Sequence, residues 1–217
     1  MIDTLQEQIR IKLNDENFVL PDINSETATE EYILLMNRLK NQRVYLAGPM
    51  DRCPDNGKTW REDITPFLID MGAVVLNPIS KPINIAKEDM GSREYKKSLK
   101  DLQNYDGLAV FMKEIRNVDL RMVDISDFLI VNIDLDIYPC GTMEEIFLGN
   151  REKKPIILHM KQGKQNTPDW LFGAIPHQLI FSSWEEIRGY LNHINTSSSI
   201  DSYKRWYFFD METIKKE

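Results

Sequence analysis

Glu145 and Asp119 are the two acidic residues whose positions around a buried segment suggest bond-breaking chemistry. The apolar run Phe128–Ile133 is expected to be a buried strand. In an open α/β sheet, ligands bind beyond the carboxyl ends of the strands, where the next helix presents unpaired N–H groups and the positive end of its dipole. If a helix starts near Gly141, Glu145 lies about one turn into that helix and therefore at the crevice. Asp119 reaches it if its own helix packs beside the strand, and two carboxylates that meet over a pocket can break glycosidic bonds.

The residues around Gly141 suggest how that helix begins. Gly141 is expected to supply a close turn, and Thr142 can act as the N-cap. Glu144 and Glu145 are adjacent in the sequence, and consecutive helical residues point about 100° apart, so only one of them can face the crevice well. We choose Glu145 and expect Glu144 to be solvated or to act indirectly. Cys140 has no histidine close in sequence to activate it, and we interpret it as a packing residue.

The rest of the sequence predicts the elements that must position these side chains. A strand, a helix and a second strand within roughly 35 residues form a right-handed parallel βαβ unit. The predicted fold is therefore α/β: a Rossmann/flavodoxin-like, doubly wound, five-stranded parallel sheet with helices on both faces. The five strands are expected at residues 44–47, 73–76, 128–133, 155–160 and 178–181.

Helical spacing of apolar residues predicts the helices between these strands. The first helix follows Trp60, Ile64, Phe67 and Met71 and ends at Gly72. The helix that carries Asp119 follows a longer stripe: Phe111, Ile115, Val118, Met122 and Ile125. Ser183 and Glu186 form a capping box for a final helix that ends at about Leu191. The Lys-rich stretch 78–106 is expected to be a helical excursion over the pocket mouth, either as a solvated surface or as a lid that meets an anionic substrate.

We expect one α/β domain, residues 43–195, between two extensions. Residues 1–42 are expected to form a helical extension, in which Thr27 and Glu30 make a capping box before a helix through Leu39. Residues 196–217 are expected to form a tail, in which a serine-rich linker precedes several aromatic residues. These aromatic residues are too apolar to remain in water. We expect a homo-oligomer whose pocket is closed by Trp206–Phe209 of a neighbouring chain, or by the segment around His177 and Gln178.

The composition excludes several classes of protein. The 217 residues are enough for one full core. The net charge of −7 argues against binding to a nucleic acid duplex, which requires a concentrated basic face. The two cysteines and three histidines lack the spacing of metal ligands, so we expect no metal and reduced thiols. Because we find neither an apolar run of membrane length nor a signal peptide pattern, we expect a cytoplasmic protein without a membrane partner.

Three segments together resemble the nucleoside 2-deoxyribosyltransferase family, including the related nucleoside 5'-monophosphate N-glycosidases. They are RVYLAGPM at the first strand, Asp119 ahead of the third strand, and GTMEEIFLG after it. The likeness covers roughly residues 43–191. It implies that Glu145, four residues after Gly141, is a nucleophile that forms a covalent glycosyl intermediate, and that Asp119 is the second active-site carboxylate. It implies no cofactor.

One position departs from the family pattern. Deoxyribosyltransferases often have an aspartate two residues before the glycine, where it contacts the nucleobase, but this chain has Pro139. Asp134 or Asp136 can substitute from the same loop. Arg52, Lys58 or Arg61 should reach a phosphate if the substrate is a nucleotide. The complete set of expected substrate-binding residues is Tyr45, Gly48, Pro49, Met50, Arg52, Lys58, Trp60, Asp134, Gly141, Thr142 and Met143.

The expected chemistry is cleavage of an N-glycosidic bond. A carboxylate beneath C1' stabilises the positive charge that develops on the sugar and then captures the sugar, while Asp119 protonates the leaving base. We expect an enzyme that transfers 2'-deoxyribosyl groups from nucleosides or nucleotides to a free nucleobase. One alternative is a 2'-deoxynucleoside 5'-monophosphate N-glycosidase that uses water as the acceptor. Another is a catalytically inactive nucleotide-binding module, for which Pro139 is the main indication.

Overall fold

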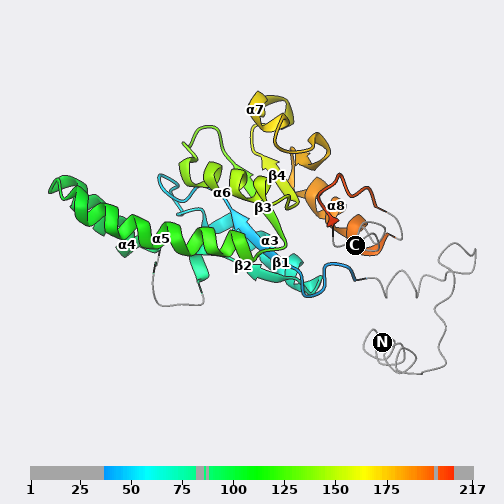
Figure 1. Cartoon of the computed structure of the whole chain (residues 1–217), viewed down its shortest axis with the longest axis horizontal. Helices are drawn as coiled ribbons and strands as arrows, with labels where there is room; N and C mark the ends of the chain where they lie inside the picture. Colours follow the sequence, from blue (N-terminus) through cyan, green and yellow to red (C-terminus); the bar gives the residue numbers. More distant parts are fainter. Residues whose placement is uncertain (1–36, 82–85, 87, 198–199, 208–217) are drawn as a thin grey trace, which may run out of the picture.

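Five parallel strands form the centre of the molecule, in the spatial order β2-β1-β3-β4-β5 (Figure 1). The computed structural model describes residues 37–81, 86, 88–197 and 200–207. The order of the strands is that of flavodoxin-like sheets, so the predicted fold class is confirmed. The strands are β1 (Arg43–Ala47), β2 (Val74–Leu76), β3 (Phe128–Ile133), β4 (Ile156–Met160) and β5 (Ile180–Phe181).

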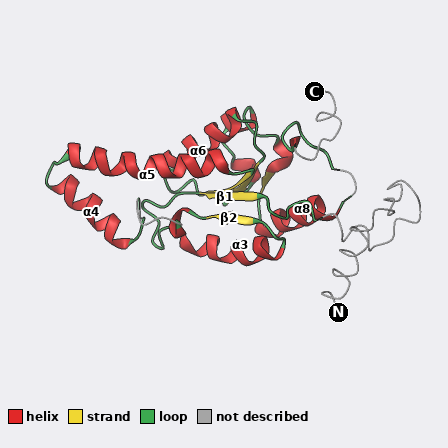
Figure 2. Cartoon of the chain, turned by 60° about the horizontal axis from the view of Figure 1, so that its bottom comes forward, coloured by secondary structure: helices red, strands yellow, loops and turns green. Residues whose placement is uncertain are grey.

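Helices cover both faces of the sheet, as the doubly wound prediction requires (Figure 2). One face packs against α3 (Lys58–Asp70) and α8 (Trp184–Thr196). The opposite face packs against α5 (Tyr105–Ile125), α6 (Cys140–Arg151) and the short α7 (Asp169–Phe172). In the described part of the chain, no helix has the length and apolarity needed to cross a membrane.

Alternation along the strands decides which side chains face which layer of helices. On β1, Val44 and Leu46 belong to the core beneath α3 and α8, whereas Tyr45 and Ala47 belong to the core beneath α5 and α6. Tyr45 lies opposite Leu129 in the parallel register of β1 and β3. The side chain of Tyr45, with its hydroxyl group, therefore faces residues of α5 and α6.

A helical hairpin extends beyond the sheet (Figures 1 and 2). After the short 3-10 turn η1 (Pro78–Ser80), helix α4 (Met90–Asp101) packs along the first part of α5. The side chain of Asp89 caps α4, and that of Asn104 caps α5. The prediction of helix within residues 78–106 is confirmed, but the helix projects away from the sheet together with α5.

Several predicted boundaries differ from the structure. The capping box of Ser183 and Glu186 is present, but α8 continues to Thr196 instead of ending at about Leu191. The fifth strand is only Ile180–Phe181, because the residues before it form the 3-10 turn η3 (His177–Leu179). Leu39 is buried but lies in a turn. The predicted capping box of the N-terminal extension lies outside the described residues.

Trp206 of the C-terminal tail is fully buried in its own chain. Its ring centroid lies 5.3 Å from that of Phe128, and its indole N–H donates a hydrogen bond of 2.8 Å to the hydroxyl of Tyr190. Phe128 begins β3, so Trp206 lies at the amino edge of the sheet, opposite the edge where parallel α/β sheets bind ligands. The prediction that Trp206 closes the pocket of a neighbouring chain is therefore wrong. Phe208 and Phe209 lie outside the described residues.

Replacing Trp206 with alanine is expected to destabilise the protein by about 3–5 kcal/mol, because it removes a fully buried indole and leaves a cavity against Phe128. Urea unfolding monitored by circular dichroism measures this loss. The matched control is Tyr207→Ala, since Tyr207 is 40% exposed; its effect should stay within about 0.5 kcal/mol. Equal effects of the two substitutions would contradict a structural role for Trp206.

Candidate active site

A cavity of ≈ 510 Å³ opens at the carboxyl ends of β1 and β3. The chain leaves β1 toward β2 on one side and leaves β3 toward β4 on the other, so the cavity lies at the switch point of the sheet, where α/β folds bind ligands. The expected site residues that line the cavity are Tyr45, Gly48, Pro49, Met50, Asp119, Gly141, Thr142 and Glu145.

Glu145 lies in the wall of this cavity and is only 9% exposed. The hydroxyl of Tyr45 donates a hydrogen bond of 2.7 Å to Oε1 of Glu145. Burial raises the pKa of Glu145 to about 8; the hydrogen bond from Tyr45 opposes this rise, and the charge of Asp119 adds to it. At neutral pH, most of the ligand-free protein therefore carries a proton on Glu145.

The raised pKa of Glu145 makes the stability of the protein dependent on pH. In the unfolded chain, Glu145 loses its proton near pH 4.5, whereas in the folded protein it keeps that proton until about pH 8. The folded state binds more protons over this range, so the contribution of Glu145 to the free energy of unfolding falls as pH rises from about 4.5 to about 8. Glu145→Gln cannot ionise and is expected to remove this fall.

Urea unfolding at pH 5 and pH 8.5 tests this prediction. The stability of Glu145→Gln relative to the unsubstituted protein should increase between the two pH values, since other titrating groups largely cancel in the difference. The control is Glu144→Gln at the exposed neighbouring position, which should show no such increase. A difference that does not depend on pH would contradict the raised pKa of Glu145.

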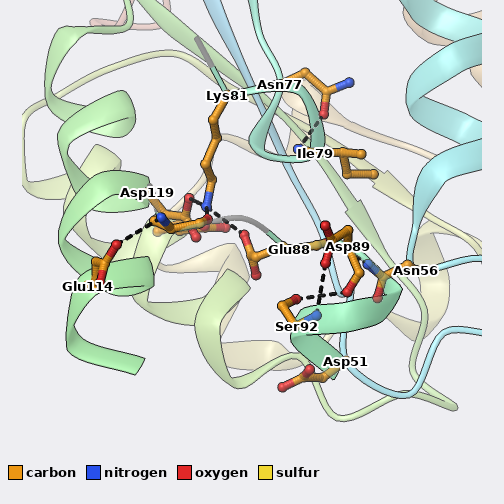
Figure 3. Close-up of polar contacts among 12 residues, drawn as sticks. Asp51, Asn56, Asn77, Ile79, Lys81, Glu88, Asp89, Ser92, Glu114 and Asp119 are labelled. Carbon is orange, nitrogen blue, oxygen red and sulfur yellow. Dashed lines mark hydrogen bonds and ion pairs between the residues drawn. The ribbon is translucent and has the colours of Figure 1, made fainter. Parts of the chain in front are cut away.

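Asp119 faces the same cavity from α5 and belongs to a buried charge cluster (Figure 3). The ammonium of Lys81 lies 2.8 Å from Oδ1 of Asp119 and 2.8 Å from Oε2 of Glu88. Burial raises the pKa of Asp119 to about 7, and the negative charge of Glu88 adds to the rise, while Lys81 opposes it. At neutral pH, Asp119 therefore carries a proton in a larger fraction of the molecules than an exposed aspartate does.

Lys81 and Glu88 were missed by sequence reasoning, which treated the whole stretch 78–106 as a surface or a lid. The signal that points to them is their position in the connection that leaves the carboxyl end of β2, the edge on which the cavity lies. Glu88 also lines the cavity. No described residue of α4 lines the cavity, but Lys96 of α4 pairs with the lining residue Asp51 at 2.6 Å, and the helical cover over the pocket mouth stays a prediction.

The loop that carries Glu88 is fastened at several points (Figure 3). The side-chain amide of Asn56 donates a hydrogen bond of 2.6 Å to the backbone carbonyl of Glu88. The carboxylate of Glu114 on α5 accepts a hydrogen bond of 3.0 Å from the backbone N–H of Ala86. Asp89, the next residue, caps α4. These contacts hold the Glu88 carboxylate at the edge of the cavity.

Arg61 holds the chain where it leaves β1. Its guanidinium is fully buried and donates to the backbone carbonyls of Leu46 (3.1 Å), Gly57 (2.7 Å) and Gly48 (2.9 Å). Arg61 lines the cavity, but these bonds engage all three of its guanidinium nitrogens. The expectation that Arg61 reaches a phosphate is not supported by this arrangement. Its position explains how the Gly48 backbone is kept at the cavity.

Five expected substrate-binding residues do not line the cavity, and a binding role for them stays a prediction: Arg52, Lys58, Trp60, Asp134 and Met143. Each has another environment. Lys58 is exposed and pairs with Glu62 at 3.2 Å, and Arg52 is exposed in a turn. Trp60 lies behind Gly48, where its ring stacks on that of Trp184 at 5.4 Å. Met143 packs against the core beneath α6.

Asp134 is held by side chains that follow the next strand. Its Oδ2 accepts a hydrogen bond of 2.6 Å from Lys161, and its Oδ1 accepts one of 2.7 Å from Gln162. Because both oxygens are engaged by the segment after β4, Asp134 does not substitute for the aspartate missing at Pro139. Asp136, the other candidate, is exposed and does not line the cavity.

Helix α6 begins one residue earlier than predicted, at Cys140, and its N-cap is Pro139. Thr142 is therefore a buried residue of the first turn and not the N-cap, so that prediction is wrong. Gly141 lies inside the helix and not in a close turn. A Cβ added at Gly141 would meet no atom within 4 Å.

Glu144 points to the rim of the cavity, away from its buried neighbour Glu145. Arg116 of α5 donates a hydrogen bond of 2.8 Å from Nε to Oε2 of Glu144 and pairs with the second oxygen through Nη2. The hydrogen bonds from Arg116 lower the pKa of Glu144. Glu144 thus stays ionised at the surface, while Glu145 is held in the interior.

Comparison with known proteins finds a likeness of fold to solved structures. No family model and no curated protein sequence matches the chain. A solved structure described as a 2-deoxyribosyltransferase from the psychrotolerant bacterium Bacillus psychrosaccharolyticus is similar in fold, with a TM-score of 0.48. The two chains are 17% identical, and the match covers 68% of this chain and 91% of the other. At this level the likeness concerns the fold alone.

Proposed function

We propose that this protein is an enzyme that cleaves the N-glycosidic bond of 2'-deoxynucleosides and transfers the sugar to another nucleobase. The observation that carries the proposal is the pairing of two buried carboxyl groups over one cavity. Glu145, which accepts a hydrogen bond from Tyr45, and Asp119 come from separate helices and line the same space. Glycosyl transfer requires two such groups, a carboxylate that acts as the nucleophile and a protonated carboxyl group that acts as the proton donor.

In the first step, an oxygen of Glu145 forms a bond to C1' of the sugar. The bond between C1' and the base nitrogen breaks, and its electron pair remains on the base. Asp119 gives its proton to the base, because a purine or pyrimidine anion leaves poorly. The products are a glycosyl ester on Glu145, a neutral free base and an ionised Asp119. Tyr45 holds the Glu145 carboxylate in position through its hydroxyl.

In the second step, a nitrogen of an incoming base attacks C1' and the ester bond to Glu145 breaks. The incoming base gives its proton to Asp119, which returns both carboxyl groups to their starting states. Attack by water in place of a base gives hydrolysis. The reaction requires Glu145 ionised and Asp119 protonated, and pKa values of about 8 and about 7 allow a fraction of the molecules to hold this combination near neutral pH.

The carboxylates around the cavity favour nucleosides over 5'-monophosphates as substrates, whereas Lys113 is a lining cation that a phosphate can meet. Three of the five N–H donors of Arg61 are engaged by backbone carbonyls, and Arg116 is paired with Glu144. Arg52 and Lys58, the other cations expected to meet a phosphate, do not line the cavity. A 5'-phosphate would also meet the carboxylates that line this space, which disfavours a dianion.

The proposed function is tested by incubating the protein with paired substrates and separating the bases by chromatography. The pairs are 2'-deoxynucleosides and ribonucleosides, each with and without a 5'-phosphate and a second free base. We expect 2'-deoxynucleosides to react faster than ribonucleosides, because the electron-withdrawing 2'-hydroxyl makes the cationic transition state harder to reach. A new nucleoside should form only when a second base is added. A ribose preference would contradict the proposal, and binding without product would indicate a binding module.

A further inference from the structure

The cluster around Asp119 contains more buried negative charge than positive charge. The side chains of Lys81, Glu88 and Asp119 are 2%, 11% and 13% exposed, respectively. The Lys81 ammonium has three N–H donors, and three oxygen atoms lie at 2.8 Å from its nitrogen: one from Glu88, one from Asp119 and the backbone carbonyl of Ala86. One ammonium therefore faces two carboxyl groups.

We propose that Lys81 and Glu88 are positioning residues that together set the proton affinity of Asp119, so that Asp119 holds one proton that it can still transfer. The single ammonium compensates one carboxylate. The second carboxyl group is taken out of water without a cation of its own, and such a group binds a proton instead of remaining charged. The use of this proton in catalysis rests on the function proposed above, whereas its retention on the cluster does not.

Of the two carboxyl groups, Asp119 acts more strongly on Glu145 than Glu88 does. The titratable and charged groups that surround it from the packed elements are Lys81, Glu88, Tyr45, Glu145, Arg61 and Arg116. Arg61 and Arg116 are engaged elsewhere, so Lys81 is the cation in direct contact with Asp119. Glu145 lines the same cavity, and the charge of Asp119 favours the protonated form of Glu145.

Glu88 and Lys81 act on this proton in opposite directions. The negative charge of Glu88 favours the protonated form of Asp119, and the positive charge of Lys81 favours the ionised form. Without Glu88, Asp119 would lose its proton before a base could accept it at neutral pH. Without Lys81, it would hold the proton too tightly to release it. The two residues thus set the proton affinity of Asp119 without either of them forming a bond to the substrate.

The test is a titration of the ligand-free full chain by NMR, with ¹³C-labelled aspartate carboxyl groups. The Asp119 signal is assigned by its loss in Asp119→Asn. We expect its midpoint near pH 7 in the unsubstituted protein. Glu88→Gln should lower the midpoint, and Lys81→Met should raise it, each by about one pH unit or more. Lys81→Arg keeps the charge and should restore most of the original midpoint.

The matched control is Glu114→Gln, which removes a carboxylate that holds the same loop through Ala86 without contact to Lys81. It should leave the Asp119 midpoint unchanged. A purely structural role for Lys81 and Glu88 would give no shift or shifts in one direction, and either result would overturn the proposal. If the substituted proteins do not fold, the unsubstituted protein decides alone: an Asp119 midpoint below about pH 5, near the ordinary value for aspartate, would overturn it.

Enzyme assays separate the failure of this proposal from the failure of the proposed function. If the NMR midpoints are as expected but no deoxynucleoside is turned over, the role of Lys81 and Glu88 is supported and the proposed function is rejected. If deoxynucleosides are turned over but the Asp119 midpoint does not change in Glu88→Gln or Lys81→Met, the proposed function is supported and the role of Lys81 and Glu88 is rejected. Where both hold, the acidic limb of the profile of kcat/KM against pH reports the lower of the two pKa values, which is that of Asp119. This limb should move to lower pH in Glu88→Gln and to higher pH in Lys81→Met.

Discussion

Replacing Glu145 with glutamine is expected to lower kcat by roughly 10⁴-fold or more while the fold remains intact. Glutamine has nearly the same shape, and its side-chain carbonyl can still accept the hydrogen bond that Tyr45 donates. It lacks the carboxylate that forms the bond to C1', so no glycosyl intermediate can accumulate. Single-turnover kinetics and mass spectrometry of the quenched enzyme measure both losses.

The adjacent residue provides the matched control for Glu145. Glu144→Gln makes the same chemical change on the same helix, but at the rim of the cavity, where the carboxylate is held by Arg116. We expect kcat to change by less than about tenfold, as for an exposed ion pair. Equal losses in the two variants, or a loss only in Glu144→Gln, would reject Glu145 as the nucleophile.

Replacing Asp119 with asparagine is expected to lower kcat by about 10²–10⁴-fold, the range typical of a lost general acid. The loss should depend on the leaving base. A purine methylated at N7 already carries a positive charge and leaves without protonation, so its nucleoside should be cleaved by Asp119→Asn at close to the unsubstituted rate. Steady-state kinetics with the methylated and unmethylated deoxynucleosides measure this difference.

Asp124→Asn is the control for Asp119, because it makes the same change on the same helix at a surface position paired with Arg121. It should leave both rates within about twofold, since exposed ion pairs contribute little. If Asp119→Asn loses the same factor with the methylated and the unmethylated substrate, Asp119 does not protonate the leaving base. A role in holding the sugar would then be the better interpretation.

The strands and helices were predictable where the spacing of apolar residues fitted only one type of secondary structure. The residues of β3 form an apolar run that is buried on both faces, and the structure starts and ends it at the predicted positions, Phe128 and Ile133. The apolar stripe of α5 was equally distinct. The residues before β5 were not, because a short apolar segment has no clear period and a 3-10 turn fits it as well as a strand.

The residues of the candidate site that follow from the positions of the strand ends were predictable. Tyr45, Asp119 and Glu145 were expected at one crevice from the rule for parallel sheets, and they line one cavity. The partners of charged loop residues were not predictable. Asp134 is engaged by Lys161 and Gln162, and Asp119 by Lys81, across sequence separations that no local pattern reports. Without an expectation for those partners, the sequence does not show which charged residues are held by other side chains of the chain.

Gly141 gives up helix stability and leaves space at the cavity. The residue is helical and has ample room for a side chain, so the backbone does not require glycine there. Alanine would stabilise a helix by up to about 1 kcal/mol relative to glycine. Because Gly141 lines the cavity, a methyl group added there would occupy volume beside the substrate. This single position therefore offers a means of tuning acceptor size: alanine or serine would exclude the bulkier bases while leaving the carboxyl groups in place.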